Sequence, residues 1–166
     1  MMETPRGMLH AEEIADSTDR MGGFVMGTSD LAKELRCAHT MMRLPFMMSL
    51  NVCILAARAA GIAILDGVYL DLSDDEGFAE HCQQGFELGF DGKTLIHPSQ
   101  LDTANRVFAP SPHDVEHAQA VIEAFADPQN AGKGVLKVNG KMTELLHLDE
   151  ARRTVAMDEA IRAFEA

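Results

Sequence analysis

Two carboxylates near the start of the chain have the residue type and placement of metal ligands. Glu3 follows a short apolar stub, and Asp30 lies just beyond a second apolar segment, residues 24–26. The pattern between them predicts a helix, so in a parallel sheet both acids reach the same edge. Hard cations such as Mg²⁺ take oxygen ligands, and we therefore predict a Mg²⁺ site formed by Glu3 and Asp30. The alternative for either acid alone is a helix cap or a solvent-exposed charge.

The turn that carries the second acid has the composition of an anion-binding helix start. Its residues are Gly27, Thr28, Ser29 and Asp30. Backbone N–H groups at the beginning of a helix favour a negatively charged group, so these four residues are our candidates for substrate binding. The pattern is weak in isolation, because ordinary tight turns use the same residues.

Three further titratable residues are weaker candidates for the site. Asp66 ends a predicted strand and is expected to face the same sheet edge, with turn formation or N-capping as the alternative. His97 ends another predicted strand, where it could donate to a ligand or satisfy a buried carbonyl. Glu144 follows a predicted hairpin, and its spacing alone indicates an exposed charge.

These residues require strands and helices that alternate along the chain. Apolar segments predict strands at 24–26, 62–65 and 93–96, in addition to the strand stub before Glu3. Helical patterns and capping residues predict helices at 9–20, 31–35, 47–60, 74–88 and 99–108. Such alternation implies parallel strands with right-handed crossovers, as in part of a (β/α)₈ barrel or part of a doubly wound α/β sheet. Half of a barrel would leave two sheet edges open.

The pattern changes after the proline-containing segment 109–112. Helices are predicted at 115–126 and 148–164, and between them Asn139-Gly140 predicts a hairpin turn flanked by short strands. We therefore expect a β/α domain over residues 1–110 and a separate C-terminal extension over residues 111–166.

Composition and charge exclude several classes of protein. The chain has 166 residues, of which 46% are hydrophobic, and a formal net charge of −12. This acidity does not favour nucleic-acid binding or an anionic membrane surface, and no apolar run is long enough to span a membrane. The three cysteines form no CxxC pair and no secretion signal is recognisable, which predicts reduced thiols in the cytoplasm.

Several segments, taken together, resemble one family of enzymes. Residues 2–7 (METPRG) and 26–31 (MGTSDL) resemble the metal-glutamate and metal-aspartate segments of the CoA-ester lyases. Residues 63–68 (AILDGV), 89–100 (GFDGKTLIHPSQ) and 108–111 (FAPS) resemble three further blocks. This is the HpcH/HpaI aldolase and citrate lyase β subunit-like family, which includes malyl-CoA and citramalyl-CoA lyases. The resemblance covers nearly the whole chain.

The resemblance implies that residues 1–110 are the last four β/α units of a TIM barrel. The family's first four units, with a substrate-binding arginine and part of the CoA site, have no counterpart here, so we expect a fragment or a split gene product. Residues 139–144 (NGKMTE) resemble the C-terminal lid of the malyl-CoA lyase branch. In that branch a lid acid reaches the active site of a neighbouring subunit, which implies a catalytic role for Glu144 in a homo-oligomer, a trimer or a hexamer.

The implied activity is Mg²⁺-dependent cleavage of a 3-hydroxyacyl-CoA, of the malyl-CoA or citramalyl-CoA type, into acetyl-CoA and a 2-oxo acid. Mg²⁺ held by Glu3 and Asp30 would stabilise the alkoxide, the turn at 27–30 would hold the carboxylate of the 2-oxo acid, and Glu144 would protonate the enolate. Two alternatives stay open at this point. One is a malyl-CoA thioesterase, and the other is an inactive half-barrel that serves as an interaction module.

Overall fold

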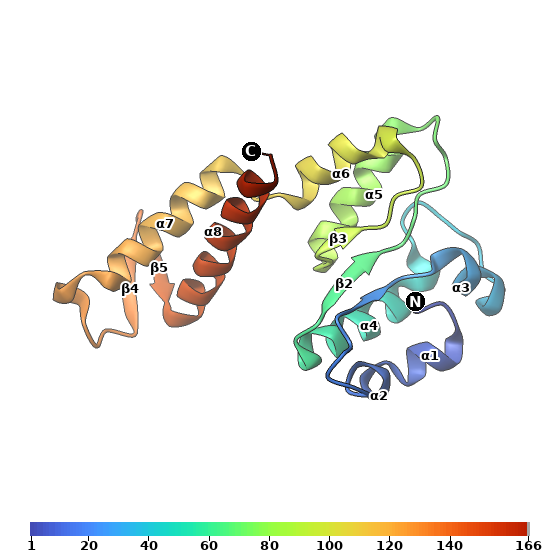
Figure 1. The fold of residues 1–166 in the computed structure, drawn as a ribbon, viewed down its shortest axis with the longest axis horizontal. Coiled ribbons are helices and arrows are strands. Elements are labelled where there is room, and N and C mark those ends of the chain that lie inside the picture. The colour runs from blue at the N-terminus through green and yellow to red at the C-terminus, as the bar shows by residue number, and fades with distance from the viewer. Residues whose placement is uncertain (166) are drawn as a thin grey trace. The chain divides into compact units, whose positions relative to one another are not determined.

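The computed structural model describes residues 1–165 of the chain, which divides into two compact units, Met1–Phe108 and Ala109–Ala166. The first unit contains a parallel sheet with helices, and the second contains two long helices and a hairpin (Figure 1). Among the described residues, no helix combines the length and the apolar character needed to cross a lipid bilayer.

The sheet of the first unit has the strand order β1-β2-β3, and its strands are parallel. Their bounds are Gly23–Val25 for β1, Ala63–Asp66 for β2 and Gly92–Lys93 for β3. On the outer side of β1, Met2 forms a parallel bridge with Met26. The predicted α/β fold with parallel strands, including the stub before Glu3, is therefore confirmed. That this sheet is half of an eight-stranded barrel stays a prediction.

The helices of the first unit follow the predicted alternation, with one clear error. They are α1 (Pro5–Leu9), α2 (Ala11–Ala15), α3 (Thr28–Leu35), α4 (Met47–Ala60), α5 (Asp75–Leu88) and α6 (Leu101–Phe108), together with the short 3₁₀ helices η1 (Leu44–Phe46) and η2 (Pro98–Gln100). The prediction of one helix at 9–20 was wrong. The Thr4 side chain accepts from the Gly7 N–H and Pro5 occupies the first turn, so α1 begins early, and the chain leaves helical geometry at His10.

The predicted strand 93–96 is also wrong beyond its first residue, and from Thr94 onward side chains add to the backbone hydrogen bonds or replace them. Thr94 donates both its N–H and its hydroxyl to the carbonyl of Asp66, at 3.0 and 2.9 Å. The N–H of Ile96 donates to Gln100 Oε1 at 3.1 Å. The chain thus leaves the sheet after β3, and Thr94 joins it to the last residue of β2.

One face of the sheet is packed against helices. Phe24 and Ile64 are paired in register on β1 and β2, and both are buried in the main core with Leu50 and Ala57 of α4. Alternation along each strand directs the neighbouring residues to the other face, where Ala63 is exposed. The helix-facing side therefore forms the hydrophobic core of this unit.

The second unit is a helical hairpin with a short antiparallel ribbon. Its elements are α7 (Pro112–Ala126), the 3₁₀ helix η3 (Pro128–Asn130), β4 (Val135–Val138), β5 (Lys141–Glu144) and α8 (Leu145–Glu165). Asn139 and Gly140 both have positive φ angles, 48° and 82°, as the predicted two-residue turn requires. The last helix begins three residues earlier than the predicted 148, directly after β5.

Candidate functional site

The Glu3 carboxylate lies against the backbone at the carboxyl end of β1. Met2 accepts a hydrogen bond from the Gly27 N–H at 2.8 Å, so Glu3 leaves the sheet beside Gly27. A Cβ built on Gly27 would lie 2.6 Å from Glu3 Cβ and 2.7 Å from Glu3 Oε2. Only glycine leaves room for this approach, and the absence of a side chain is what allows the Glu3 carboxylate to occupy the space.

Asp30 lies in the first turn of α3, three residues after Gly27, and its side chain is exposed. The structure therefore places Glu3 and Asp30 on the same end of the sheet, at β1 and the helix that follows it. Within residues 1–165, neither carboxylate forms a hydrogen bond or an ion pair with another side chain. Their oxygen atoms are available to a ligand from solvent.

The amide groups of this turn differ in their availability. The N–H of Gly27 already donates to the Met2 carbonyl, which corrects the prediction that all four amides of 27–30 could bind an anion. Helix α3 starts without a side-chain cap, so the amides of Thr28, Ser29 and Asp30 have no capping acceptor. A helix start of this kind attracts an anionic group through its N–H groups and its dipole.

The donor set fits a small hard cation. Among the described residues, no group of three or more His, Cys, Asp or Glu side chains is arranged to hold a metal. Mg²⁺ usually keeps several waters and takes one or two protein carboxylates together with oxygen atoms of its substrate. Two unpartnered carboxylates beside a glycine cradle meet that requirement, whereas a structural zinc site would need more ligands of a different type.

Asp66 has a different environment from the one that the sequence predicts. Its side chain is fully buried, and Arg43 Nη1 donates to its two oxygens at 2.7 and 2.8 Å. Lys93 Nζ lies 3.1 Å from Asp66 Oδ2, and the Gly67 N–H donates to Oδ1 at 2.8 Å. The expectation that Asp66 faces the open rim is therefore corrected: its position in β2 directs the carboxylate into the interior, where cations surround it.

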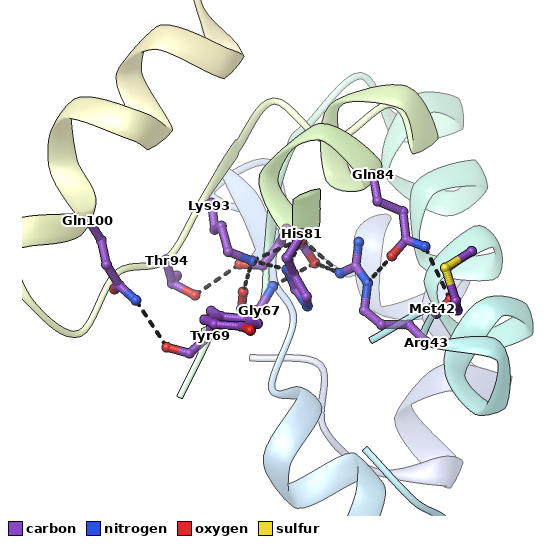
Figure 2. A network of polar contacts seen from close by, with 10 residues as sticks. Met42, Arg43, Gly67, Tyr69, His81, Gln84, Lys93, Thr94 and Gln100 are labelled. Atoms are coloured by element: carbon purple, nitrogen blue, oxygen red, sulfur yellow. Dashed lines mark hydrogen bonds and ion pairs between the residues drawn. The ribbon is translucent and has the colours of Figure 1, made fainter. Parts of the chain in front are cut away.

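The cluster around Asp66 joins three parts of the first unit, and Figure 2 shows Arg43, His81 and Lys93 directed toward one another. Arg43 precedes η1, His81 lies on α5 and Lys93 ends β3. Nε of Arg43 also donates to Gln84 of α5. A loop, a helix and a strand are thus held together by one buried carboxylate.

Burial controls the protonation of this cluster. The pKa of His81 is lowered to about 2, first by burial and then by the charges of Lys93 and Arg43, so the imidazole is neutral. Its Nδ1 lies 2.7 Å from Lys93 Nζ and accepts from that ammonium, which leaves the proton on Nε2. Burial also lowers the pKa of Lys93, while the Asp66 carboxylate opposes that shift.

Sequence reasoning missed Arg43, His81 and Lys93 as partners. Lys93 belongs to the segment 89–100 that carries the family resemblance, so its position offered a signal. Arg43 lies in a stretch without periodicity, and no pattern there indicates a buried guanidinium. Three buried polar atoms have no hydrogen-bond partner within the described part of the chain: Arg43 Nη2, His81 Nε2 and Thr28 Oγ1.

The remaining candidates, His97 and Glu144, lie in different units. His97 is exposed and caps η2, where its Nδ1 accepts from the Ser99 N–H at 3.2 Å. This local cap explains His97 without a ligand. Glu144 is the last residue of β5, half-buried, and its N–H donates to His147 Nδ1 at 2.9 Å. The catalytic role of Glu144 and the lid role of its hairpin stay predictions.

Sequence comparisons relate the chain to known proteins. Residues 1–98 match the family described as HpcH/HpaI aldolase/citrate lyase. All 166 residues align with the (3S)-malyl-CoA thioesterase of Cereibacter sphaeroides at 52% identity, covering 58% of that protein. The citrate lyase subunit beta of Leuconostoc mesenteroides subsp. cremoris is 36% identical over 96% of this chain, which covers 53% of that relative. The chain spans little more than half the length of these relatives.

Structural comparisons agree with this relationship. The CitE protein of Mycobacterium tuberculosis, in complex with magnesium, acetoacetate and coenzyme A, matches with a TM-score of 0.70 and 29% identity over 92% of this chain and 58% of that one. A citrate lyase from Burkholderia xenovorans LB400 matches with a TM-score of 0.79 at 18% identity, over 96% of this chain and 51% of that one. The second likeness supports the fold alone.

Proposed function

Because the chain belongs to the HpcH/HpaI aldolase/citrate lyase family, we propose that it forms part of a Mg²⁺-dependent enzyme that acts on the CoA thioester of a 3-hydroxy acid. The favoured reaction is hydrolysis of a malyl-CoA-type thioester to the free acid and CoA. The observation that carries this choice is the 52% identity to (3S)-malyl-CoA thioesterase along the whole chain. It favours the thioesterase alternative over the lyase that the motifs alone suggest.

Glu3 and Asp30 would hold the cation in this proposal. Within the described residues their carboxylates have no competing side-chain partner, and Gly27 leaves the space in which the Glu3 carboxylate lies. When bound, Mg²⁺ would supply Lewis-acid polarisation of a substrate oxygen. The magnesium in the CitE complex at 29% identity supports this assignment.

The start of α3 would orient the substrate through its backbone. The amides of Thr28, Ser29 and Asp30 are the donors for a terminal carboxylate, and the helix dipole adds to the attraction. Because Gly27 donates to Met2, the anion would be held by these three amides and not by the whole turn.

Glu144 would move the proton in either reaction. In hydrolysis it would accept a proton from the attacking water, and in carbon–carbon cleavage it would donate one to the enolate carbon. A hairpin on a separate unit could present Glu144 to the site of a neighbouring copy in a homo-oligomer. We expect Glu144→Gln to lower kcat by orders of magnitude at a similar KM, since binding does not require the proton transfer.

The second candidate is cleavage of the carbon–carbon bond to acetyl-CoA and a 2-oxo acid. It is favoured by the similarity to citrate lyase subunit beta at 36% identity and by the hairpin that carries Glu144. Both reactions use the same cation and the same CoA ester. They differ in the bond that breaks, so product analysis separates them.

The test is incubation of the 166-residue chain with (3S)-malyl-CoA and Mg²⁺, followed by chromatography of the CoA species and a carbonyl assay for glyoxylate. Free CoA and malate without acetyl-CoA support the thioesterase. Acetyl-CoA with an equal amount of glyoxylate supports the lyase. If neither forms and calorimetry detects no Mg²⁺ binding, both proposals are contradicted and the inactive interaction module is favoured.

A further inference from the structure

Gly67, directly after β2, has its backbone N–H and its backbone carbonyl both hydrogen-bonded to the buried cluster. Its N–H donates to Asp66 Oδ1 at 2.8 Å, and its carbonyl accepts a short hydrogen bond from Lys93 Nζ. Lys93 Nζ also contacts Asp66 Oδ2 at 3.1 Å and His81 Nδ1 at 2.7 Å. The three acceptors match the three hydrogens of an ammonium, so the side chain of Lys93 is fixed in one geometry.

The charge balance of Asp66 does not require Lys93. Arg43 alone neutralises the carboxylate, with hydrogen bonds to both oxygens. Burial of Lys93 as a second cation therefore costs desolvation free energy, although Asp66 is already neutralised by Arg43. Besides its ion pair with Asp66, Lys93 contacts His81 Nδ1 and the Gly67 carbonyl, and the second of these contacts fixes the backbone directly after β2.

Gly67 in turn contacts the start of α3. A Cβ built on Gly67 would lie 2.6 Å from Thr28 Oγ1, 2.8 Å from Thr28 Cγ2 and 3.0 Å from the Met26 carbonyl oxygen. Thr28 is only 1% exposed and is the first residue of α3, two positions before Asp30. The backbone of Gly67 therefore forms a close support beneath the turn that presents the amides and Asp30.

We propose that Lys93 is a positioning residue for the metal and substrate end of α3, acting through the Gly67 peptide on Thr28. This inference rests on the proposed function, because it concerns the same cation site. Lys93 does not touch the cation or the substrate in this proposal. It fixes the support against which α3 begins, and so sets the separation between Asp30 on α3 and Glu3 beside β1.

The primary test compares the Mg²⁺ affinity of three purified chains by calorimetry. Lys93→Met removes the ammonium but leaves Asp66 paired with Arg43, so the fold is expected to persist. We expect its Mg²⁺ affinity to fall by about 10-fold or more, which is typical when a residue that supports a metal ligand without touching the metal is removed. Arg58→Met is the matched control, because Arg58 pairs with Asp91 near the opposite end of β2 and does not contact Gly67. Its Mg²⁺ affinity should equal that of the unaltered chain.

A second readout does not depend on the metal. Amide hydrogen exchange measured by NMR should become faster in Lys93→Met at Gly27 and Leu31, whose N–H groups donate to the Met2 and Gly27 carbonyls at the start of α3, relative to the amides of β4 and β5. A uniform change across the chain, or no change at these two amides, would contradict the positioning role. If Lys93→Met does not fold, Gly67→Ala tests the contact between Gly67 and Thr28 on which the proposal depends: its Cβ would displace Thr28 and weaken Mg²⁺ binding, and normal Mg²⁺ binding would overturn the proposal.

The outcomes separate this inference from the proposed function. Absence of Mg²⁺ binding by the unaltered chain overturns the metal site, while the exchange measurement still tests the support of α3. Normal Mg²⁺ binding by both Lys93→Met and Gly67→Ala leaves the metal site in place and overturns the role of Lys93.

Discussion

Asp30 and Asp66 lie beyond β1 and at the end of β2 in the same parallel sheet, but their surroundings are opposite. Asp30 is exposed and shares its edge with Glu3, which lies against Gly27. Asp66 is fully buried and has Arg43 and Lys93 as partners. Strand ends in β/α folds carry both functional and structural acids, and position alone does not separate them. The neighbouring side chains separate the two kinds of acid. A carboxylate without cationic neighbours can bind a metal, whereas a carboxylate paired with two cations cannot.

The largest effect on stability is expected from Asp66→Ala. Removal of this carboxylate leaves the Arg43 and Lys93 cations buried without a counter-charge, which costs about 3–5 kcal/mol of unfolding free energy. Because domains of this size are stable by only about 5–15 kcal/mol, the variant should unfold at much lower urea concentration or fail to fold. Urea titration followed by circular dichroism measures the change. A loss below about 1 kcal/mol would mean that the cluster does not hold the unit together.

Asp30→Asn should show the reverse pattern, with function lost and stability kept. We expect Mg²⁺ affinity to fall at least about 100-fold, because loss of a direct metal ligand should weaken binding at least as much as loss of a residue that only supports a ligand. The unfolding free energy should change by less than about 1 kcal/mol, the size of a helix-dipole interaction in the first turn of α3. Glu34→Gln, an exposed acid on the same helix, is the control and should bind Mg²⁺ normally. Unchanged Mg²⁺ binding by Asp30→Asn would remove Asp30 from the metal role.

Acid should destabilise the buried cluster through His81. The folded-state pKa of His81 is about 2, against an ordinary value of 6.5. Below pH 6.5 the unfolded chain therefore binds a proton at His81, whereas the folded chain does not. Stability is therefore lost as the pH falls below 6.5, by about 2 kcal/mol between pH 7 and pH 5. His81→Gln should remove that part of the pH dependence, measured as the difference between two urea series. Parallel curves for both chains would contradict a neutral buried His81.

The sequence predicted the Glu3 and Asp30 edge, helix α4, the Asn139-Gly140 turn and the family, because each depends on local pattern or on a motif. A glycine turn and an apolar helix are determined by residues adjacent in the chain. The family prediction is confirmed by the match over residues 1–98. In contrast, the rim position of Asp66 was wrong, because its partners come from residues distant in the chain.

The predicted boundaries of one helix and one strand were wrong where side chains join or replace backbone hydrogen bonds. Thr4 caps α1 ahead of the predicted start, and Thr94 binds the Asp66 carbonyl where a strand was predicted to continue. Both residues are Thr, whose hydroxyl can replace a backbone partner. Periodicity detects the apolar face of an element, but it does not detect such local replacements.

The smallest effect is expected at the other end of β2, where Arg58 pairs with Asp91. Nη1 and Nη2 of Arg58 each donate to Asp91 at 2.9 Å, and Asp91 also accepts from the Ile64 N–H at 2.8 Å. The Arg58 side chain is 38% exposed, in contrast to the full burial of Arg43, so water screens the pair and replaces it when it is broken. We expect Arg58→Met to reduce the unfolding free energy by no more than about 1 kcal/mol, with a smaller loss at high salt. A loss of unfolding free energy as large as that of Asp66→Ala would show that solvent exposure does not explain the difference between these two ion pairs. The contrast between Asp30 and Asp66 would then also require an explanation other than solvent exposure.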